Sequence, residues 1–312
     1  MSVLDTGTRI EADRAPAAAA AAEETPLRRL AADFFESRVA AAAFALLCVI
    51  IALALLAPAI VPQNPYNLAE VDVLDSRLPP GSRAMAGYTY WLGTDGAGRD
   101  LVSAMLYGLR ISLAVGVVSC LIATVIGAAV GLVAAYAGGR VESLLMRLVD
   151  LQLSFPAILI ALMLIAILGK GVDKIIIALV TVQWAYYART VRGTALAEMN
   201  KEYVEAARCL GFGHARILFR QILPNVLPPL IVVATVQAAH AVALEATLSF
   251  LGVGLPRTEP SLGLLIANGF EYMLSDKYWI SFFPGVVLLA TIMAINLVGD
   301  QLRDVLNPRL RR

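Results

Sequence analysis

The chain has 312 residues, of which 59% are apolar and 16% charged, and its formal net charge at pH 7 is +1. An ordinary soluble domain has about a quarter of its residues charged, so this composition predicts a membrane protein. A charge balance this close to neutral offers no reason to expect nucleic-acid binding, which needs a basic surface against the phosphates.

The N-terminal segment 1–30 is polar and contains an alanine run, so it lacks the apolar residues needed for a core. We expect residues 1–35 to form a disordered cytoplasmic tail. The charge-free segment 39–61 is long enough to cross a hydrocarbon core of about 30 Å and predicts the first transmembrane helix. A cleaved signal peptide is the alternative, but its apolar region has only about 7 to 15 residues.

Five further charge-free segments complete a predicted all-α membrane bundle of six transmembrane helices. They are 111–136, 151–169, 175–188, 226–244 and 279–298. The segment 175–188 is the weakest, because it is short for a full crossing, although Tyr186 and Tyr187 at its end are suited to an aromatic belt. With only five spans, the two termini would lie on opposite sides.

This pattern predicts four regions of the chain. After the tail, residues 36–108 would hold the first transmembrane helix and an extracytoplasmic loop, and residues 109–301 a core of five helices. A second cytoplasmic tail would follow at 302–312.

The distribution of Lys and Arg predicts the orientation, because these residues are retained on the cytoplasmic side. The segment 189–220 carries six of them, and the segment after the last span carries four more. Both are therefore expected in the cytoplasm, with the N-terminus on the same side, so the sequence predicts a multi-pass membrane protein with both termini in the cytoplasm. The short turn with Lys170 and Lys174 goes against this trend.

Small residues recur along one face of the second predicted span. Gly127 and Gly131 form a GxxxG step, and Gly116, Cys120 and Ala123 precede them at near-helical spacing. Small residues allow helices to approach closely in lipid, which predicts packing against another helix. The alternative is that glycine is simply common in membrane helices.

Between the fourth and fifth predicted spans, the sequence predicts two short helices joined by a glycine hinge. The first would begin at Asn200 as its N-cap and break at Gly211 and Gly213. The second, over 214–222, would end at Pro224. Such a hairpin, apolar on one side and basic on the other, is suited to a groove on a partner protein.

This hairpin resembles the EAA loop of the integral membrane subunits of ABC importers. Its residues in register with the motif are Glu205, Ala206, Ala207, Gly211, Leu223 and Pro224. Gln221 departs from the general pattern, which has Ile at that position. The ending at 222–225 is similar to the dipeptide, oligopeptide and nickel branch of the family.

Further segments resemble the C-type permease of that branch in the same order along the chain. They are 91–100, 106–113, 146–150, 155–156, 187–193, 249–252 and 299–309. The resemblance implies the type I ABC importer transmembrane fold, with residues 192–225 as the EAA loop. It implies a second, B-type permease, two ATPase subunits that bind ATP and Mg, and an extracytoplasmic substrate-binding protein. Peptides are the expected substrate, and nickel or another small solute is the alternative.

Missing motifs predict that this subunit has no catalytic role and binds no cofactor itself. The sequence contains no GxxxxGK[ST] loop to hold phosphates and no HExxH motif. Neither the three scattered cysteines nor His214 and His240 suggest a metal site. A self-sufficient secondary transporter is a less favoured alternative, because the two halves show no convincing repeat.

Two polar groups of the fifth predicted span are candidates for the translocation path. Ionisable side chains at membrane depth are costly and often functional, which singles out Glu245 and His240. A structural role is the alternative for both, and it is favoured for His240. In the loop before the second span, Asp95, Arg99 and Asp100 predict a structural turn with an ion pair, rather than a docking or gating element.

Overall fold

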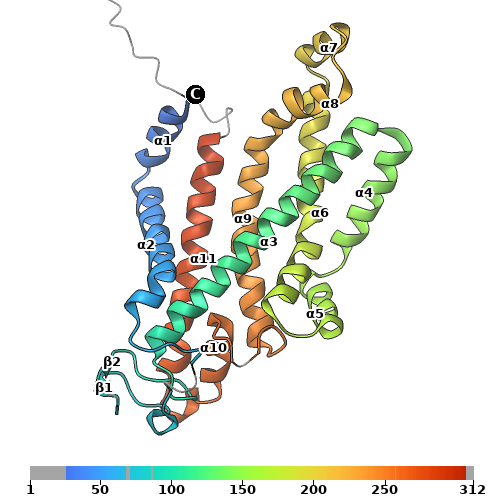
Figure 1. Cartoon of the computed structure of the whole chain (residues 1–312). Helices are drawn as coiled ribbons and strands as arrows, with labels where there is room; N and C mark the ends of the chain where they lie inside the picture. Colours follow the sequence, from blue (N-terminus) through green and yellow to red (C-terminus); the bar gives the residue numbers. More distant parts are fainter. Residues whose placement is uncertain (1–25, 68–70, 86, 257, 307–312) are drawn as a thin grey trace, which may run out of the picture.

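Five long helices run between the two ends of the molecule, with shorter elements at either end (Figure 1). The computed structural model describes residues 26–67, 71–85, 87–256 and 258–306. The long helices are α2 (Arg38–Ile60), α3 (Leu101–Ala137), α6 (Val172–Met199), α9 (Leu223–Phe250) and α11 (Trp279–Leu306). The shorter helices are α1 (Pro26–Glu36), α4 (Gly139–Ser154), α5 (Ala157–Leu168), α7 (Glu202–Cys209), α8 (His214–Arg216) and α10 (Leu262–Phe270).

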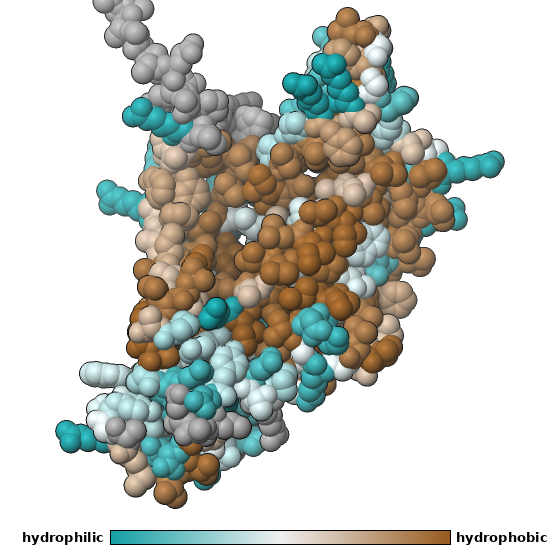
Figure 2. Space-filling view, in the orientation of Figure 1, coloured by the Kyte–Doolittle hydropathy of each residue, from teal (hydrophilic) through white to brown (hydrophobic). Residues whose placement is uncertain are grey.

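Helices α2, α3 and α11, and the helical run from α8 through α9, are each long and apolar enough to cross a membrane. Helices α4 and α5 meet the same criterion as a pair, but they are bent by 90° at the break between them. Figure 2 shows apolar side chains over the middle of the molecule and hydrophilic ones at its two ends, around α7 and around the strands. This band is the surface that a bilayer covers.

Helix α6 corresponds to the weakest predicted span, and it lies inside the bundle. It packs along α3 and also contacts α4, α5 and α9. Residues along its length, such as Ile175, Leu179, Tyr187 and Val191, are buried. A helix surrounded by other helices needs less apolar surface than one facing lipid, which explains its weak hydropathy signal.

The α3–α6 contact confirms the packing predicted for Gly127 and Gly131. A Cβ on Gly127 would lie 2.4 Å from the Trp184 carbonyl oxygen, and one on Gly131 would lie 2.5 Å from that of Ala188. Neither position has room for a side chain without moving the backbone of α6.

Three sequence predictions need correction. The prediction of a disordered tail over 1–35 is wrong from Pro26 onward, because α1 forms there and packs against α2 and α11. Residues 1–25 lie outside the described part of the chain. The third predicted span, 151–169, is not one straight helix, because Pro156 follows the end of α4 at Ser154 and the chain turns sharply. Tyr187 is buried in the core, so of the predicted aromatic belt only Tyr186 is exposed.

The end of the molecule opposite α7 is closed by the loop before α3 and by α10. A two-stranded antiparallel sheet pairs β1 (Ser82–Arg83) with β2 (Thr89–Tyr90) in this loop. The Tyr90 hydroxyl donates a hydrogen bond of 2.9 Å to Asp75, and burial raises the pKa of this phenol. Short 3-10 helices lie before β1, at Val73–Asp75, and after α10, at Met273–Ser275.

The ends of the described chain lie on the same side as α7 (Figure 1). Helix α1 packs against α11, whose last turn reaches the same end of the bundle. Four spans meet the length and hydropathy criterion, and the bent α4–α5 pair would be a fifth. The remaining predicted span corresponds to the buried helix α6.

Candidate functional site

Helix α7 projects beyond the apolar band at one end of the bundle (Figures 1 and 2). It ends in a Schellman turn: the Gly211 N–H donates to the Arg208 carbonyl and the Phe212 N–H to the Ala207 carbonyl. Gly211 has φ +73°, in the left-handed region that favours glycine. The predicted glycine break therefore lies at Gly211, whereas Gly213 has φ −64° and needs no glycine.

The second helix of the loop does not end at Pro224, contrary to the prediction. Helix α8 continues through a π-helical stretch, Ile217–Ile222, directly into α9. The Leu223 N–H donates to the Leu218 carbonyl, which widens the helix just before the proline. Pro224 then occupies the first turn of α9, where a missing N–H is tolerated.

Asn200 is also not the N-cap of α7. It ends α6, and α7 begins at Glu202 after Lys201. Helix α6 extends eleven residues beyond the predicted span end at Ala188, so Arg189 and Arg192 lie on a helix and not in a loop. These two arginines pair with Asp150 and Glu142 of α4, with Arg189 lying 2.5 Å from Asp150.

Apolar side chains of the loop are anchored in the bundle core. Val204 and Ala207 from α7, and Ile217 and Ile222 from the π-helical stretch, are buried in one cluster with residues of α3, α6 and α9. Because these four side chains are removed from water, the hairpin is packed onto the bundle as part of it.

A hydrogen-bond network at the base of α7 strengthens this attachment. The Tyr203 hydroxyl donates to the Glu198 carboxylate at 2.6 Å, and the Asn225 amide donates to Tyr203 at 3.1 Å. Lys201 pairs with the other oxygen of Glu198 at 2.6 Å. Burial and the neighbouring Glu198 carboxylate raise the pKa of Tyr203 to about 12. Asn225 also donates to the Gln221 carbonyl at 2.8 Å, so the network joins α6, α7 and α9.

A second tie joins the loop to α3. The ring of His214, at the start of α8, lies edge-on to the Tyr136 ring at 5.4 Å, and its Nδ1 is hydrogen-bonded to the Tyr136 hydroxyl. Tyr136 is in the last turn of α3. The loop is thus attached to three of the five long helices.

The residues predicted for the loop fall into two groups. Ala207 is buried and Leu223 half-buried, so they face the bundle. Glu205, Ala206, Gly211 and Pro224 are exposed. Leu210 and Phe219 are also exposed, at 71% and 62%, although they are large and apolar. An exposed face of this kind, on an anchored support, is suited to binding a partner protein.

Sequence reasoning missed Tyr203 and Tyr136 as parts of this site. Tyr203 lies five residues after Glu198, and their hydrogen bond forms because the chain turns between α6 and α7. The prediction treated Asn200 as the start of the next helix, so it did not include this turn. Tyr136 and His214 are 78 residues apart, and no local pattern links them.

The two candidates for the translocation path lie in different surroundings. Glu245 is fully buried, and it accepts hydrogen bonds from Ser112 at 2.6 Å and Ser249 at 2.8 Å. Ser112 is on α3, so this carboxyl joins α3 to α9 inside one subunit. His240 is exposed on α9 and does not meet Glu245 in this network. Within this single subunit, His240 is therefore not an interior residue of the helix bundle.

Asp95, Arg99 and Asp100 form the predicted structural turn. Asp95 accepts from the backbone N–H groups of Ala97 and Arg99 and pairs with the Arg99 side chain at 2.7 Å. Asp100 caps α3 by accepting from the Ser103 N–H at 2.8 Å. Burial raises the pKa of the Asp100 carboxyl.

Among the described residues, no group of three or more His, Cys, Asp or Glu side chains is arranged to hold a metal ion.

Comparison with known proteins decides the family. Residues 123–312, more than half of the chain, match the model of the binding-protein-dependent transport system inner membrane component. The chain belongs to this family of ABC importer permeases. Residues 25–80 of the permease match the N-terminal transmembrane domain of oligopeptide transport permease C. Together these matches confirm the C-type resemblance drawn from the EAA loop and its flanking segments.

Individual relatives match the permease over most of its length. A putative peptide transport system permease of Brucella suis is 42% identical over 85% of this chain and 86% of its own. The di/tripeptide transport system permease of Pseudomonas aeruginosa is 36% identical over 92% and 93%. A glutathione transport system permease of Pectobacterium atrosepticum is 34% identical over 92% of each chain.

A solved structure supports the fold. The inward-facing MetNI methionine ABC transporter contains a chain that superposes on the permease with a TM-score of 0.54. The alignment covers 65% of the permease and 96% of that chain, at 22% sequence identity. The permease is thus a multi-pass inner-membrane protein with an ABC importer transmembrane fold.

Proposed function

We propose that this permease, together with a second B-type permease, forms the translocation path of a peptide importer. We further propose that α7 receives movement from a cytoplasmic ATPase subunit. The observation that carries this proposal is the attachment of α7, whose inner face is buried and whose base is bonded to α6 and α9. A helix held in this way moves with the bundle and does not swing freely. The names of the relatives support peptides as the substrate.

The proposed orientation places α7 in the cytoplasm. Both α1 and the last turn of α11 lie at that end of the bundle, so the termini would be cytoplasmic as well. Arg189 and Arg192 in the last part of α6, and Arg216 in α8, support this direction, because positive residues are retained in the cytoplasm. The opposite end, with β1, β2 and α10, then faces the extracytoplasmic binding protein that delivers substrate.

ATP and Mg would be bound by two partner ATPase subunits and not by this chain. Closure of the ATPase pair would displace each docked loop, and the attached helices α6 and α9 would follow. Nucleotide can shift the bundle between its two states only if it binds one of them more tightly. The exposed Glu205, Ala206 and Leu210 would form the contact with the ATPase.

The test is transport by the complete importer in proteoliposomes, with radiolabelled trialanine outside and ATP inside. Glu205→Lys reverses a charge on the exposed face of α7, and we expect uptake to fall at least about tenfold, since a lost charge-assisted contact has this size. Glu202→Lys is the matched control, because Glu202 is exposed on the same helix but outside the motif. Wild-type uptake by Glu205→Lys, at equal insertion and assembly, would refute the proposed coupling role.

A further inference from the structure

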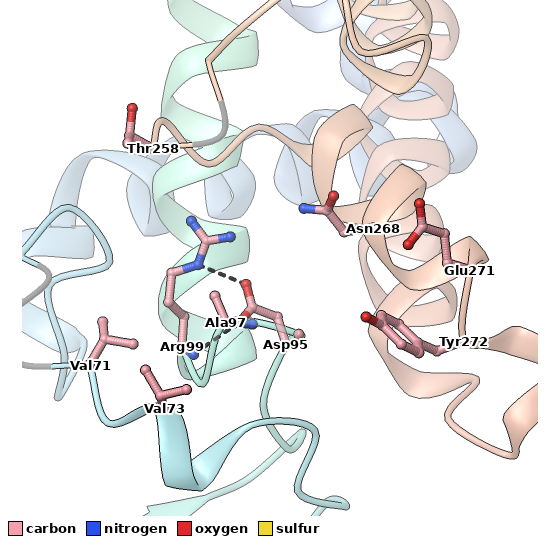
Figure 3. Close-up of a pocket in the computed structure, with 10 residues that line it drawn as sticks. Val71, Val73, Asp95, Ala97, Arg99, Thr258, Asn268, Glu271 and Tyr272 are labelled. Atoms are coloured by element: carbon pink, nitrogen blue, oxygen red, sulfur yellow. Dashed lines mark hydrogen bonds and ion pairs between the residues drawn. The ribbon is translucent and has the colours of Figure 1, made fainter.

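A cavity of about 560 Å³ lies at the end of the molecule opposite α7, between the loop before α3 and the α10 region (Figure 3). One wall is made by Asp95, Ala97 and Arg99, and the other by Asn268, Glu271 and Tyr272. This volume is typical of sites that bind small molecules.

Arg99 presents the free end of its guanidinium group to this cavity. The residue is only 5% exposed, and its Nε bonds to Asp95 at 2.7 Å. Neither Nη atom has a hydrogen-bond partner among the residues that the structure describes. Figure 3 shows these two nitrogens pointing away from Asp95, toward the space between Thr258 and Asn268. A ligand with two acceptor oxygens could take one hydrogen bond from each of these nitrogens.

The opposite wall carries polar groups that also lack partners in the described part of the chain. The Asn268 amide, the Glu271 carboxylate and the Tyr272 hydroxyl make no hydrogen bond there, and all three residues line the cavity. Glu271 is exposed at the rim, whereas Asn268 and Tyr272 are half-buried. Among the described residues, the two walls therefore offer a guanidinium end and a carboxylate that no other side chain occupies.

The cavity is held open by its own framework. Arg77 has φ +60°, and its guanidinium lies over the Tyr272 ring at 5.3 Å. On the other wall, Gly98 has φ +85°, and a Cβ there would lie 2.2 Å from the Asp72 carbonyl oxygen. A non-glycine residue in the left-handed region persists only where its surroundings hold it.

These groups select a ligand that has both a carboxylate and an amine. The paired nitrogens of Arg99 match a carboxylate, which accepts two parallel hydrogen bonds. A simple anion would be repelled by Glu271, and a simple cation would leave the Arg99 donors unsatisfied. We propose that this cavity binds a short zwitterionic peptide, with its C-terminal carboxylate on Arg99 and its N-terminal ammonium group on Glu271. The proposal rests on the proposed peptide-import function, and it adds a substrate site on this subunit.

The test measures equilibrium binding of radiolabelled trialanine to the complete importer in lipid nanodiscs, without its binding protein. N-acetyl-trialanine and trialanine amide are the end-blocked probes. We expect each to bind at least about tenfold more weakly than trialanine, because each loses one charge-assisted contact.

Variants then assign each end of the peptide. Glu271→Gln should weaken trialanine about tenfold and leave N-acetyl-trialanine unchanged. Arg99→Lys keeps the positive charge beside Asp95 but removes the two parallel N–H donors of the guanidinium group. It should therefore weaken the binding of trialanine and leave the binding of trialanine amide unchanged. Asp276→Asn is the control, since Asp276 lies near Tyr272 but does not line the cavity, and asparagine tolerates its φ of +59°.

Equal affinity for trialanine and both blocked peptides would overturn the inference, as would an absence of saturable binding. In a separate assay, the binding protein is added to the same nanodiscs. If the variants weaken its docking and leave trialanine binding unchanged, the cavity is a docking surface and the inference is also wrong. ATP-driven trialanine uptake by the wild-type importer is measured separately. Uptake without binding at this cavity would refute the proposed peptide site and leave the proposed import function standing. An absence of uptake would refute the proposed import function itself.

Discussion

The Asn225 side chain, in the first turn of α9, donates a hydrogen bond of 3.1 Å to the Tyr203 hydroxyl at the base of α7. Tyr203 in turn donates to Glu198, near the end of α6. These two bonds join the projecting helix to the two long helices that flank it. Any force on α7 is therefore shared between α6 and α9.

Tyr203→Phe should reduce the coupling of ATP hydrolysis to transport. The phenylalanine ring fits the same space but removes both bonds of the hydroxyl, and each typical hydrogen bond is worth about 0.5–1.5 kcal/mol. We expect ATP hydrolysis to continue while the number of peptides imported per ATP falls several-fold. Parallel assays of phosphate release and peptide uptake in proteoliposomes measure this ratio. An unchanged ratio would show that apolar anchoring alone transmits the movement.

The hydrogen bonds of the Tyr203 hydroxyl should be insensitive to pH over the physiological range. The pKa of Tyr203 is raised to about 12, above the ordinary value near 10. The bonded phenol therefore stabilises the fold fully below pH 10, and this contribution is lost only as the pH rises through about 12. The difference in Tm between wild type and Tyr203→Phe should be constant from pH 7 to pH 9. A difference that disappears within this range would contradict the assigned bond.

Gly211→Ala should weaken the end of α7. Its φ of +73° disfavours any residue with a Cβ, at a cost of about 1–2 kcal/mol, although the space around it is open. We expect the protein to insert normally, with faster proteolysis of the loop and reduced uptake.

Gly213→Ala is the matched control for this change. Gly213 also has open space around it, but its φ is −64°, which alanine adopts readily. It should behave as wild type in both assays. Equal behaviour of the two variants would mean that the Schellman turn at Gly211 is not needed.

Gly127→Ala should destabilise the helix bundle. Its Cβ would meet backbone and side-chain atoms of Trp184 and Tyr187 within 2.5 Å, and such overpacking costs about 1–3 kcal/mol. We expect a lower Tm in detergent. Gly193→Ala, on α6 where nothing lies within 4 Å, is the control and should not lower the Tm. A Tm for Gly127→Ala equal to that of the control would contradict the close α3–α6 contact.

Apolar runs predicted the long helices because burial in lipid dominates their sequence. Apolar runs did not predict helices that are amphipathic or that are covered by other parts of the protein. Helix α4 mixes Arg147 and Asp150 with leucines, and no apolar run marks its start at Gly139. Helix α10 is only nine residues long, too short to be recognised as a span.

Within the EAA loop, the glycine turn was predictable and the continuous helix through Pro224 was not. Glycine at 211 has a local reason, its left-handed φ, that a sequence pattern can express. The π-helical stretch depends on Ile217 and Ile222 reaching a core shared with α3 and α6. Tertiary packing of this kind overrides the rule that proline ends a helix.

Glu245 provides a test that separates a structural role from a role in the translocation path. Glu245→Ala would leave the buried Ser112 and Ser249 hydroxyls without their acceptor, which costs about 1–3 kcal/mol. Glu245→Gln keeps an acceptor and a donor of the same size in place. We therefore expect a lower Tm and poor assembly for Glu245→Ala, and near-normal Tm and peptide uptake for Glu245→Gln. Normal Tm with lost uptake in Glu245→Gln would instead show that transport needs the carboxylate itself, and would return Glu245 to the translocation path.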